Sequence, residues 1–148
     1  MLELNLPEFD YKITKKEGRL FIWDIIRSKY IALTPEEWVR QHFIHYLVRH
    51  KNISPALIAV ETGREYNGRA KRCDIVVWNT TGNQELIVEC KASHVPLSEN
   101  TTFQLGSYNA KTMAPFLALT NGINHFYFTR NGENYSRIEE LPEMVSGG

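Results

Sequence analysis

Hydrophobic and polar positions follow a strand period most clearly between Cys73 and Lys91. Two β-branched runs, Ile75 to Trp78 and Leu86 to Val88, flank a turn that contains Gly82, and this arrangement predicts a β-hairpin. Because successive side chains of a strand point to opposite faces, one face of the hairpin collects only apolar residues: Ile75, Val77, Leu86, Val88 and Cys90. Asp74, Glu89 and Lys91 all lie on the other face.

Two pairing registers keep those three charges together. If the turn is centred between Thr81 and Gly82, opposed residue numbers sum to 163 and Asp74 lies across from Glu89. A shift of two residues places Asp74 opposite Lys91 instead. Opposed residues have Cβ atoms only about 4.5–5.5 Å apart, so either register predicts that the charged side chains lie close together.

A helical period begins at Thr34. Thr34 is a favourable N-cap, Pro35 is tolerated at the first helical position, and Glu37 follows three residues after the cap. The helix is predicted to run to about His50. Its apolar stripe comprises Val39, Phe43, Tyr46 and Leu47. Glu37 has two interpretations, which are not exclusive: its carboxylate bonds back to the Thr34 amide, or it faces a functional site from this helix.

The other segments predict short strands and a second helix. Residues 11–13 and 20–23 flank a turn at Gly18 and predict a peripheral hairpin. The remaining elements are a strand at 57–60, a loop at 62–70, a helix from Ser98 to about Met113, and strands at 116–119, 123–129 and 135–138. The tail from 141 to 148 is expected to fray. The order αβββαβ, with added terminal strands, predicts one α/β domain of residues 1–148, a mixed β-sheet flanked by helices.

Composition is typical of a soluble globular protein, with 43% hydrophobic and 23% charged residues. No apolar run approaches the roughly 18 residues of a membrane span, and the first residues do not resemble a secretion signal. A cytoplasmic location is therefore expected, in which Cys73 and Cys90 are reduced, buried thiols. Basic and acidic residues number 17 each. This balance predicts weak affinity for nucleic acid without a partner or a neighbouring domain.

Basic residues nevertheless gather just before Asp74. They are Arg64, Arg69, Lys71 and Arg72. One interpretation is an ordinary solvated loop. The other is that Arg69, Lys71 and Arg72 contact the phosphate groups of a nucleic acid, and the sequence leaves both open.

The charged face of the central hairpin has the residues of a metal site. Two close carboxylates repel each other unless a cation lies between them, and carboxylate oxygens are the ligands that Mg²⁺ prefers. Lys91, two residues after Glu89, points to the same place as Asp74 and Glu89. A hairpin with three surface charges is the alternative, but the strongly apolar flanking residues favour a site.

The spacing of these residues resembles the catalytic motif of the PD-(D/E)xK nuclease superfamily. From Trp23 to Phe128 the chain is similar to one branch, the N-terminal nuclease domain of type I restriction enzyme R subunits. The similar pieces are Leu33-Thr34-Pro35-Glu36-Glu37, Arg72-Cys73-Asp74-Ile75-Val76-Val77, Glu89-Cys90-Lys91, Gln104-x-x-x-Tyr108 and Leu119-Thr120-Asn121-Gly122. Two features depart from the pattern: residue 73 is Cys rather than Pro, and the G-x-x-x-x-G-K-[ST] loop of a helicase motor is absent.

The resemblance implies a restriction-endonuclease-like fold and Mg²⁺-dependent hydrolysis of duplex DNA, with Mn²⁺ as a substitute. Asp74 and Glu89 would hold the metal, with Glu37 and the main-chain carbonyl of Cys90 as further candidate ligands. Lys91 would orient the attacking water, stabilise the developing charge, or both.

The resemblance also implies supporting residues and partners. Gln104 would support the active site and Tyr108, one helical turn later, would contact DNA. Cleavage would be coupled to a helicase or translocase, in a system with methyltransferase and specificity subunits. Two alternatives remain: a non-catalytic nucleic-acid-binding module of the same fold, and a nuclease that acts on branched DNA or RNA.

Overall fold

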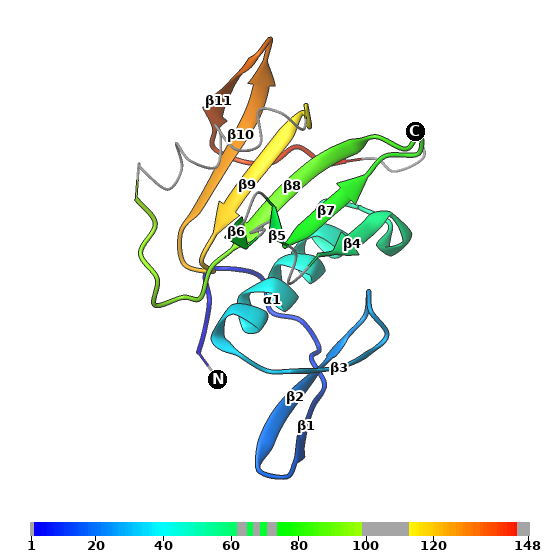
Figure 1. Cartoon of the computed structure of the whole chain (residues 1–148), viewed down its shortest axis with the longest axis vertical. Helices are drawn as coiled ribbons and strands as arrows, with labels where there is room; N and C mark the ends of the chain where they lie inside the picture. Colours follow the sequence, from blue (N-terminus) through cyan, green and yellow to red (C-terminus); the bar gives the residue numbers. More distant parts are fainter. Residues whose placement is uncertain (1, 62–64, 67–68, 71–73, 99–112, 145–148) are drawn as a thin grey trace.

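The computed structural model describes residues 2–61, 65–66, 69–70, 74–98 and 113–144. Its largest element is a six-stranded sheet in the order β11-β10-β9-β8-β7-β4 (Figure 1). The strands are β4 (Ile58–Val60), β7 (Ile75–Trp78), β8 (Gln84–Cys90), β9 (Phe116–Thr120), β10 (His125–Asn131) and β11 (Asn134–Ile138). β8 and β9 are parallel, and the other neighbours are antiparallel. The expected mixed sheet of an α/β fold is therefore confirmed.

The parallel pair requires a long connection, because a tight turn cannot join parallel strands. The helix expected from Ser98 to about Met113 falls in this connection, but residues 99–112 lie outside the part of the chain that the structure describes. Within the described ranges, one α-helix, α1 (Pro35–His50), packs against the sheet. The αβββαβ pattern, with helices flanking the sheet, is therefore not confirmed.

The hairpin of β7 and β8 has the first of the two expected registers. Ile75 pairs with Val88, and Val77 pairs with Leu86, so the paired residue numbers sum to 163. The apolar face of this hairpin lies in the main core, where its members are nearly inaccessible to solvent: Ile75, Val77, Leu86, Val88 and Cys90. This register brings the residues after β8 to the level of the residues before β7.

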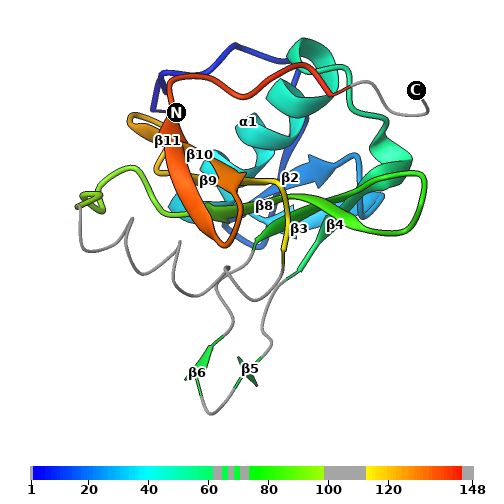
Figure 2. The same cartoon turned by 90° about the horizontal axis from the view of Figure 1, so that it is seen from above.

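Helix α1 begins where its capping residues predict. The Oγ1 of Thr34 accepts a hydrogen bond of 3.0 Å from the amide of Glu37, and Pro35 occupies the first turn. Three members of the expected stripe, Val39, Phe43 and Leu47, have no exposed surface. They pack against the apolar face of the central hairpin, so α1 is held on one face of the six-stranded sheet (Figure 2).

The opposite side of α1 is also covered, which its sequence does not predict. Polar residues on this side are also buried, each less than a tenth exposed: Glu37, Arg40, Gln41, His42 and His45. The cover comes from the N-terminal segment and from a second sheet. The sheet has three strands in the order β1-β2-β3: β1 (Ile13–Lys16), β2 (Arg19–Asp24) and β3 (Lys29–Ala32).

The expected N-terminal hairpin corresponds to β1 and β2, with Gly18 in the turn at φ +78°. Strand β3 was not expected. It forms because the side chain of Asp24 accepts hydrogen bonds from the amides of Ile26 (2.7 Å) and Arg27 (2.9 Å), which turns the chain back. The sheet is not merely peripheral, because Ile22 is fully buried in the main core.

Two other segments differ from what was expected. The loop expected at 62–70 contains a two-stranded hairpin of β5 (Glu65–Tyr66) and β6 (Arg69–Ala70). The tail expected to fray is docked as far as Met144: Leu141 is buried, and the Met144 amide donates to the Lys51 carbonyl at 3.0 Å. The strand expected at 57–60 begins one residue later, after a short 3-10 helix, η1 (Pro55–Leu57). No helix in the described ranges could cross a membrane.

One buried histidine of α1 predicts a pH dependence of folding. Phe9 stacks on His45 with 4.1 Å between ring centroids. Burial, and then the nearby charge of Arg49, lower the pKa of His45 from 6.5 to about 4. Between these two values the unfolded chain binds a proton that the folded chain does not. Above pH 6.5 His45 is neutral in both states and does not reduce the free energy of unfolding. As the pH falls from 6.5 towards 4, proton uptake by the unfolded chain lowers the free energy of unfolding.

The expected result is a smaller acid-induced fall in melting temperature for His45→Phe than for the wild type. Phenylalanine preserves the stacking on Phe9 but cannot take up a proton. Thermal unfolding of both proteins from neutral pH down to about pH 4.5 measures this difference. Parallel curves for the two proteins would show that His45 does not couple protonation to unfolding.

Candidate active site

Asp74 connects the start of β7 to the end of β8. Its amide donates to the Val88 carbonyl at 2.9 Å. Its carboxylate Oδ2 accepts from the amide of Cys90 at 2.6 Å, and its Oδ1 accepts from Arg40 Nη2 at 2.7 Å. The carboxylate thus takes the place of a main-chain carbonyl at the end of the strand ladder, which fixes its position next to Cys90.

Glu89 and Lys91 lie beside this point at the end of β8. Lys91 Nζ is 3.2 Å from Glu89 Oε1, and Glu89, like Asp74, is less than a tenth exposed. The amide of Lys91 donates to the Thr120 carbonyl of β9 at 2.8 Å. Two strands therefore hold Lys91 in place, and its ammonium group stays next to a mostly buried carboxylate.

Glu37 points its carboxylate away from the helix cap. Its Oε1 accepts from Arg40 Nη1 at 2.5 Å, and its Oε2 accepts from Arg27 Nη2 and Gln41 Nε2, both at 2.9 Å. The cap itself is made by Thr34, whose side chain bonds the Glu37 amide. Of the two interpretations of Glu37, the geometry therefore favours a carboxylate facing the candidate site.

Arg40 joins Glu37 to Asp74 and was not identified from the sequence. Its guanidinium bridges Glu37 Oε1 and Asp74 Oδ1, and it also lies 3.1 Å from Glu36. The charges of Glu37 and Asp74 raise the pKa of Arg40 although burial opposes this, so Arg40 is a permanent cation. Its position three residues after Glu37 places both on one helix face, which is the signal that could have identified it.

A second layer of the same network comes from the N-terminal sheet. Asp24, which is fully buried at the end of β2, accepts from Gln41 Nε2 at 2.9 Å and from Arg27 Nε at 2.6 Å. Burial alone would raise the pKa of Asp24, but the hydrogen bonds from Arg27 and Gln41 outweigh it and hold the pKa below its usual value. Asp24 therefore remains a carboxylate inside the protein.

The network carries more negative than positive charge. Its four carboxylates are Asp24, Glu36, Glu37 and Asp74, and its two guanidinium groups are Arg27 and Arg40. Two buried atoms of the network have no hydrogen-bond partner: Gln41 Oε1 and Arg40 Nε. The excess of carboxylate charge and the acceptor oxygen of Gln41 are compatible with a bound cation, whereas Arg40 Nε is a donor that a cation cannot satisfy.

The state of Asp74 reflects its burial. Burial raises the pKa of Asp74 to about 7, and the ion pair with Arg40 and the Cys90 amide oppose this shift only in part. Around neutral pH the carboxylate is therefore close to its titration point, and any added positive charge near it favours the ionised form. Cys90 contributes its amide to Asp74, while its thiol is buried and burial raises the thiol pKa.

Five other expected site residues lie outside the described residues or have only their strand described. Gln104, Tyr108, Lys71 and Arg72 are outside the described residues, and for Arg69 only its place in β6 is described. Their expected contacts with DNA or with the site stay predictions. Among the residues that are described, no three His, Cys, Asp or Glu side chains form a ready-made metal cluster.

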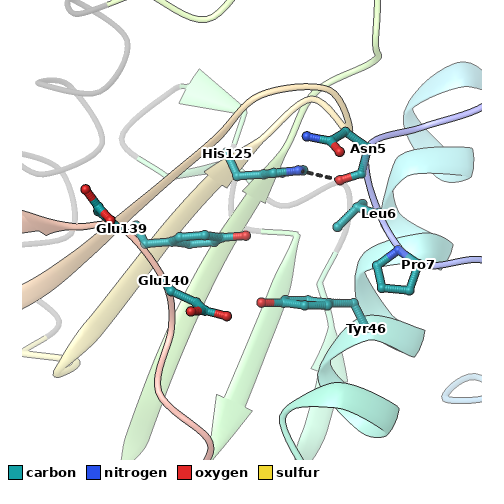
Figure 3. A pocket seen from close by; sticks show the side chains of 8 residues that line it. Asn5, Leu6, Pro7, Tyr46, His125, Glu139 and Glu140 are labelled. Atoms are coloured by element: carbon teal, nitrogen blue, oxygen red, sulfur yellow. Dashed lines mark hydrogen bonds between the residues drawn. The ribbon is translucent and has the colours of Figure 1, made fainter.

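A hollow of about 350 Å³ lies elsewhere, between the N-terminal segment, α1 and β10 (Figure 3). It is lined by Asn5, Leu6, Pro7, Tyr46, His125, Tyr127, Glu139 and Glu140. The ring of His125 is fixed on both sides, by Thr120 Oγ1 at 2.7 Å and by the Asn5 carbonyl at 2.9 Å. These contacts dock the N-terminal segment, and none of the lining residues belongs to the candidate site.

Comparison with known protein families returns a match, while comparison with curated proteins returns none. The matching model is described as type I restriction enzyme R protein N terminus and covers residues 35–143. This range begins with the first residue of α1 and includes the whole six-stranded sheet. It leaves out the three strands of the N-terminal sheet. The chain therefore belongs to the family of type I restriction enzyme R protein N termini.

Proposed function

We propose that this chain is a metal-dependent nuclease domain that hydrolyses the phosphodiester bonds of DNA. The observation that carries the proposal is the position of Asp74, whose buried carboxylate accepts a hydrogen bond from the amide of Cys90, the residue between the ion-paired Glu89 and Lys91. The sequence pattern has an acid, an acid and a lysine in this order, and the fold brings their strand ends together.

The residues present fit a divalent cation. Mg²⁺ keeps several of its waters and is usually held by only one or two carboxylates, so a cluster of three acids is not required. Asp74 and Glu89 are the proposed ligands, and the Cys90 carbonyl and Glu37 are further candidates. The surplus of carboxylates in the network around Arg40 supplies the negative charge that attracts the cation.

The metal would supply Lewis-acid activation of the phosphoryl group and of a water. Lys91 acts directly on the reacting atoms in this proposal. Its ammonium group is oriented by Glu89, so it can donate hydrogen bonds to the attacked phosphate as negative charge develops there. Arg40 is a positioning residue, because its guanidinium holds Asp74 in place and is itself held by Glu37.

The proposed setting follows from the family. An R protein belongs to a restriction enzyme, so we propose duplex DNA as the substrate and a motor, a methyltransferase and a specificity subunit as partners. The balanced charge of the chain, 17 basic and 17 acidic residues, supports dependence on such partners for delivery of DNA. Two alternatives from the sequence, branched DNA or RNA as the substrate, share the same chemistry.

Metal binding tests the ligand assignment. Calorimetric titration with Mn²⁺ is expected to show binding to the wild type and binding at least about tenfold weaker in Glu89→Gln, because a neutral amide is a poor ligand. Glu85→Gln is a matched control. Glu85 lies at the opposite end of the same strand, β8, where its carboxylate accepts a hydrogen bond from Asn79. Unchanged Mn²⁺ affinity in Glu89→Gln would remove Glu89 from the metal site.

A further inference from the structure

One face of the N-terminal sheet combines aromatic and basic side chains. Ile22 points into the main core and pairs with Ile13 on one side and Ile31 on the other. Because side chains alternate along a strand, their neighbours occupy the opposite face. We call this the outer face. It consists of Lys12, Thr14, Lys16, Arg19, Phe21, Trp23, Tyr30 and Ala32.

Contacts between side chains agree with this assignment. The Arg19 guanidinium lies over the Phe21 ring, 5.8 Å from its centroid. The rings of Trp23 and Tyr30, which are paired across β2 and β3, meet edge to face at 5.2 Å. Tyr30 is 45% exposed, and neither Phe21 nor Trp23 belongs to the core clusters. The outer face is thus a row of rings reachable from solvent.

The charge of this face is of one sign. Its eight positions include three cations, Lys12, Lys16 and Arg19, and no carboxylate. Residues 12–32 contain six basic and two acidic residues in a chain whose total charge is zero. One of those two acids, Asp24, is buried on the inner side. A surface that offers cations and flat rings together is complementary to an anionic polymer with planar groups.

We propose that the outer face binds single-stranded nucleic acid. The bases stack on Phe21, Trp23 and Tyr30, and the phosphates lie against Lys12, Lys16 and Arg19. A single strand is required because the bases of a duplex are already stacked on one another and cannot cover an aromatic side chain. Stacking does not depend on base identity, so this binding has little sequence preference.

The outer face is tied to the candidate active site. Trp23 directly precedes Asp24, which accepts hydrogen bonds from Gln41 of α1. The turn that follows carries Arg27, which bonds Glu37. In Figure 1 the three-stranded sheet projects beyond α1, on the side away from the six-stranded sheet. The inference goes beyond the proposed nuclease activity and rests on the outer face itself, so it stands whether or not the chain cleaves DNA.

The test uses the full chain with a fluorescein-labelled oligothymidylate of about 20 nucleotides, in chelator, so that binding is separate from cleavage. Fluorescence anisotropy is measured between about 50 and 200 mM salt; three phosphate contacts predict a slope of about −2 for log K against log salt. Lys12→Glu/Lys16→Glu is expected to weaken binding at least about tenfold. The matched control is Lys15→Glu/Lys29→Glu, which makes the same charge change on the inner face of the same sheet and should bind within about twofold of the wild type.

A second pair of variants tests stacking. Tyr30→Ser and Trp23→Ala should each weaken binding about tenfold, as expected for loss of one stacked base. Tyr11→Ser, at an exposed tyrosine outside the outer face, should not. Equal losses in the two charge-reversed doubles, unchanged binding in both aromatic variants, tighter binding of a duplex of the same length, or no binding of the oligomer would each overturn the proposal. Because binding is measured in chelator, where cleavage does not contribute, failure of this proposal is distinguishable from failure of the nuclease proposal.

Discussion

Arg40→Met is expected to destabilise the fold by about 3–5 kcal/mol, because it removes the cation between two buried carboxylates. In the native protein the Arg40 guanidinium bonds both Glu37 and Asp74, and all three residues are nearly inaccessible to solvent. Methionine fills a similar volume, so the loss reports the charge and not a cavity. For a chain of this length the melting temperature should fall by on the order of 10 °C.

The control for this substitution is Arg49→Met on the same helix. Arg49 lies in the last turn of α1 and is exposed, and a surface change of this kind usually stays within about 0.5 kcal/mol. Chemical denaturation of both variants and the wild type gives the comparison. If Arg40→Met unfolded at the same denaturant concentration as Arg49→Met, the network around Arg40 would not hold the site together.

Lys91→Gln is expected to slow Mg²⁺-dependent DNA cleavage by about 10²–10³-fold, the usual effect of removing one electrostatic stabiliser of a transition state. Glutamine can still donate a hydrogen bond to Glu89, so the folding cost should be only on the order of 1 kcal/mol. The rate is measured well below the melting temperature, so that both proteins remain folded. This separates the chemical effect from the loss of the Lys91–Glu89 ion pair.

Lys51→Gln provides the matched control. Lys51 also forms an ion pair with a glutamate, since its Nζ lies 3.5 Å from Glu140 Oε1. This pair lies at the C-terminal end of α1, where Lys51 is the C-cap. The same substitution there should leave the cleavage rate within about twofold of the wild type. Equal slowing by the two variants would mean that loss of a lysine ion pair, and not loss of Lys91 from the site, causes the effect.

The sequence predicts the parts of the structure that local rules determine. Alternation along the hairpin placed Ile75 and Val88 on the core face, and the observed register is one of the two that the turn allowed. Thr34 and Pro35 located the start of α1. These features depend on the period of side chains and on capping, both of which can be read within a few residues.

Features that depend on distant parts of the chain were not predicted. The helix spacing of Arg40 and Glu37 is visible in the sequence, but Arg40 contacts Asp74 from 34 residues away, and no local pattern predicts that contact. Strand β3 follows from a turn closed by Asp24, with Ser28 at φ +52°, which is an uncommon conformation for serine. The burial of Leu141 likewise depends on a core surface that exists only in the folded protein.

The most direct test of the nuclease proposal is nicking of supercoiled plasmid by the full chain fused to a DNA-binding domain. The fusion raises the effective concentration at DNA and offsets the weak binding expected of a chain without net charge. The wild-type fusion should nick the plasmid in Mg²⁺ but not in chelator, and Asp74→Asn should abolish nicking, while Asp10→Asn, at an exposed acid, should not. Nicking that survives Asp74→Asn, or a folded wild-type fusion that binds Mn²⁺ and leaves the plasmid intact, would contradict the proposal.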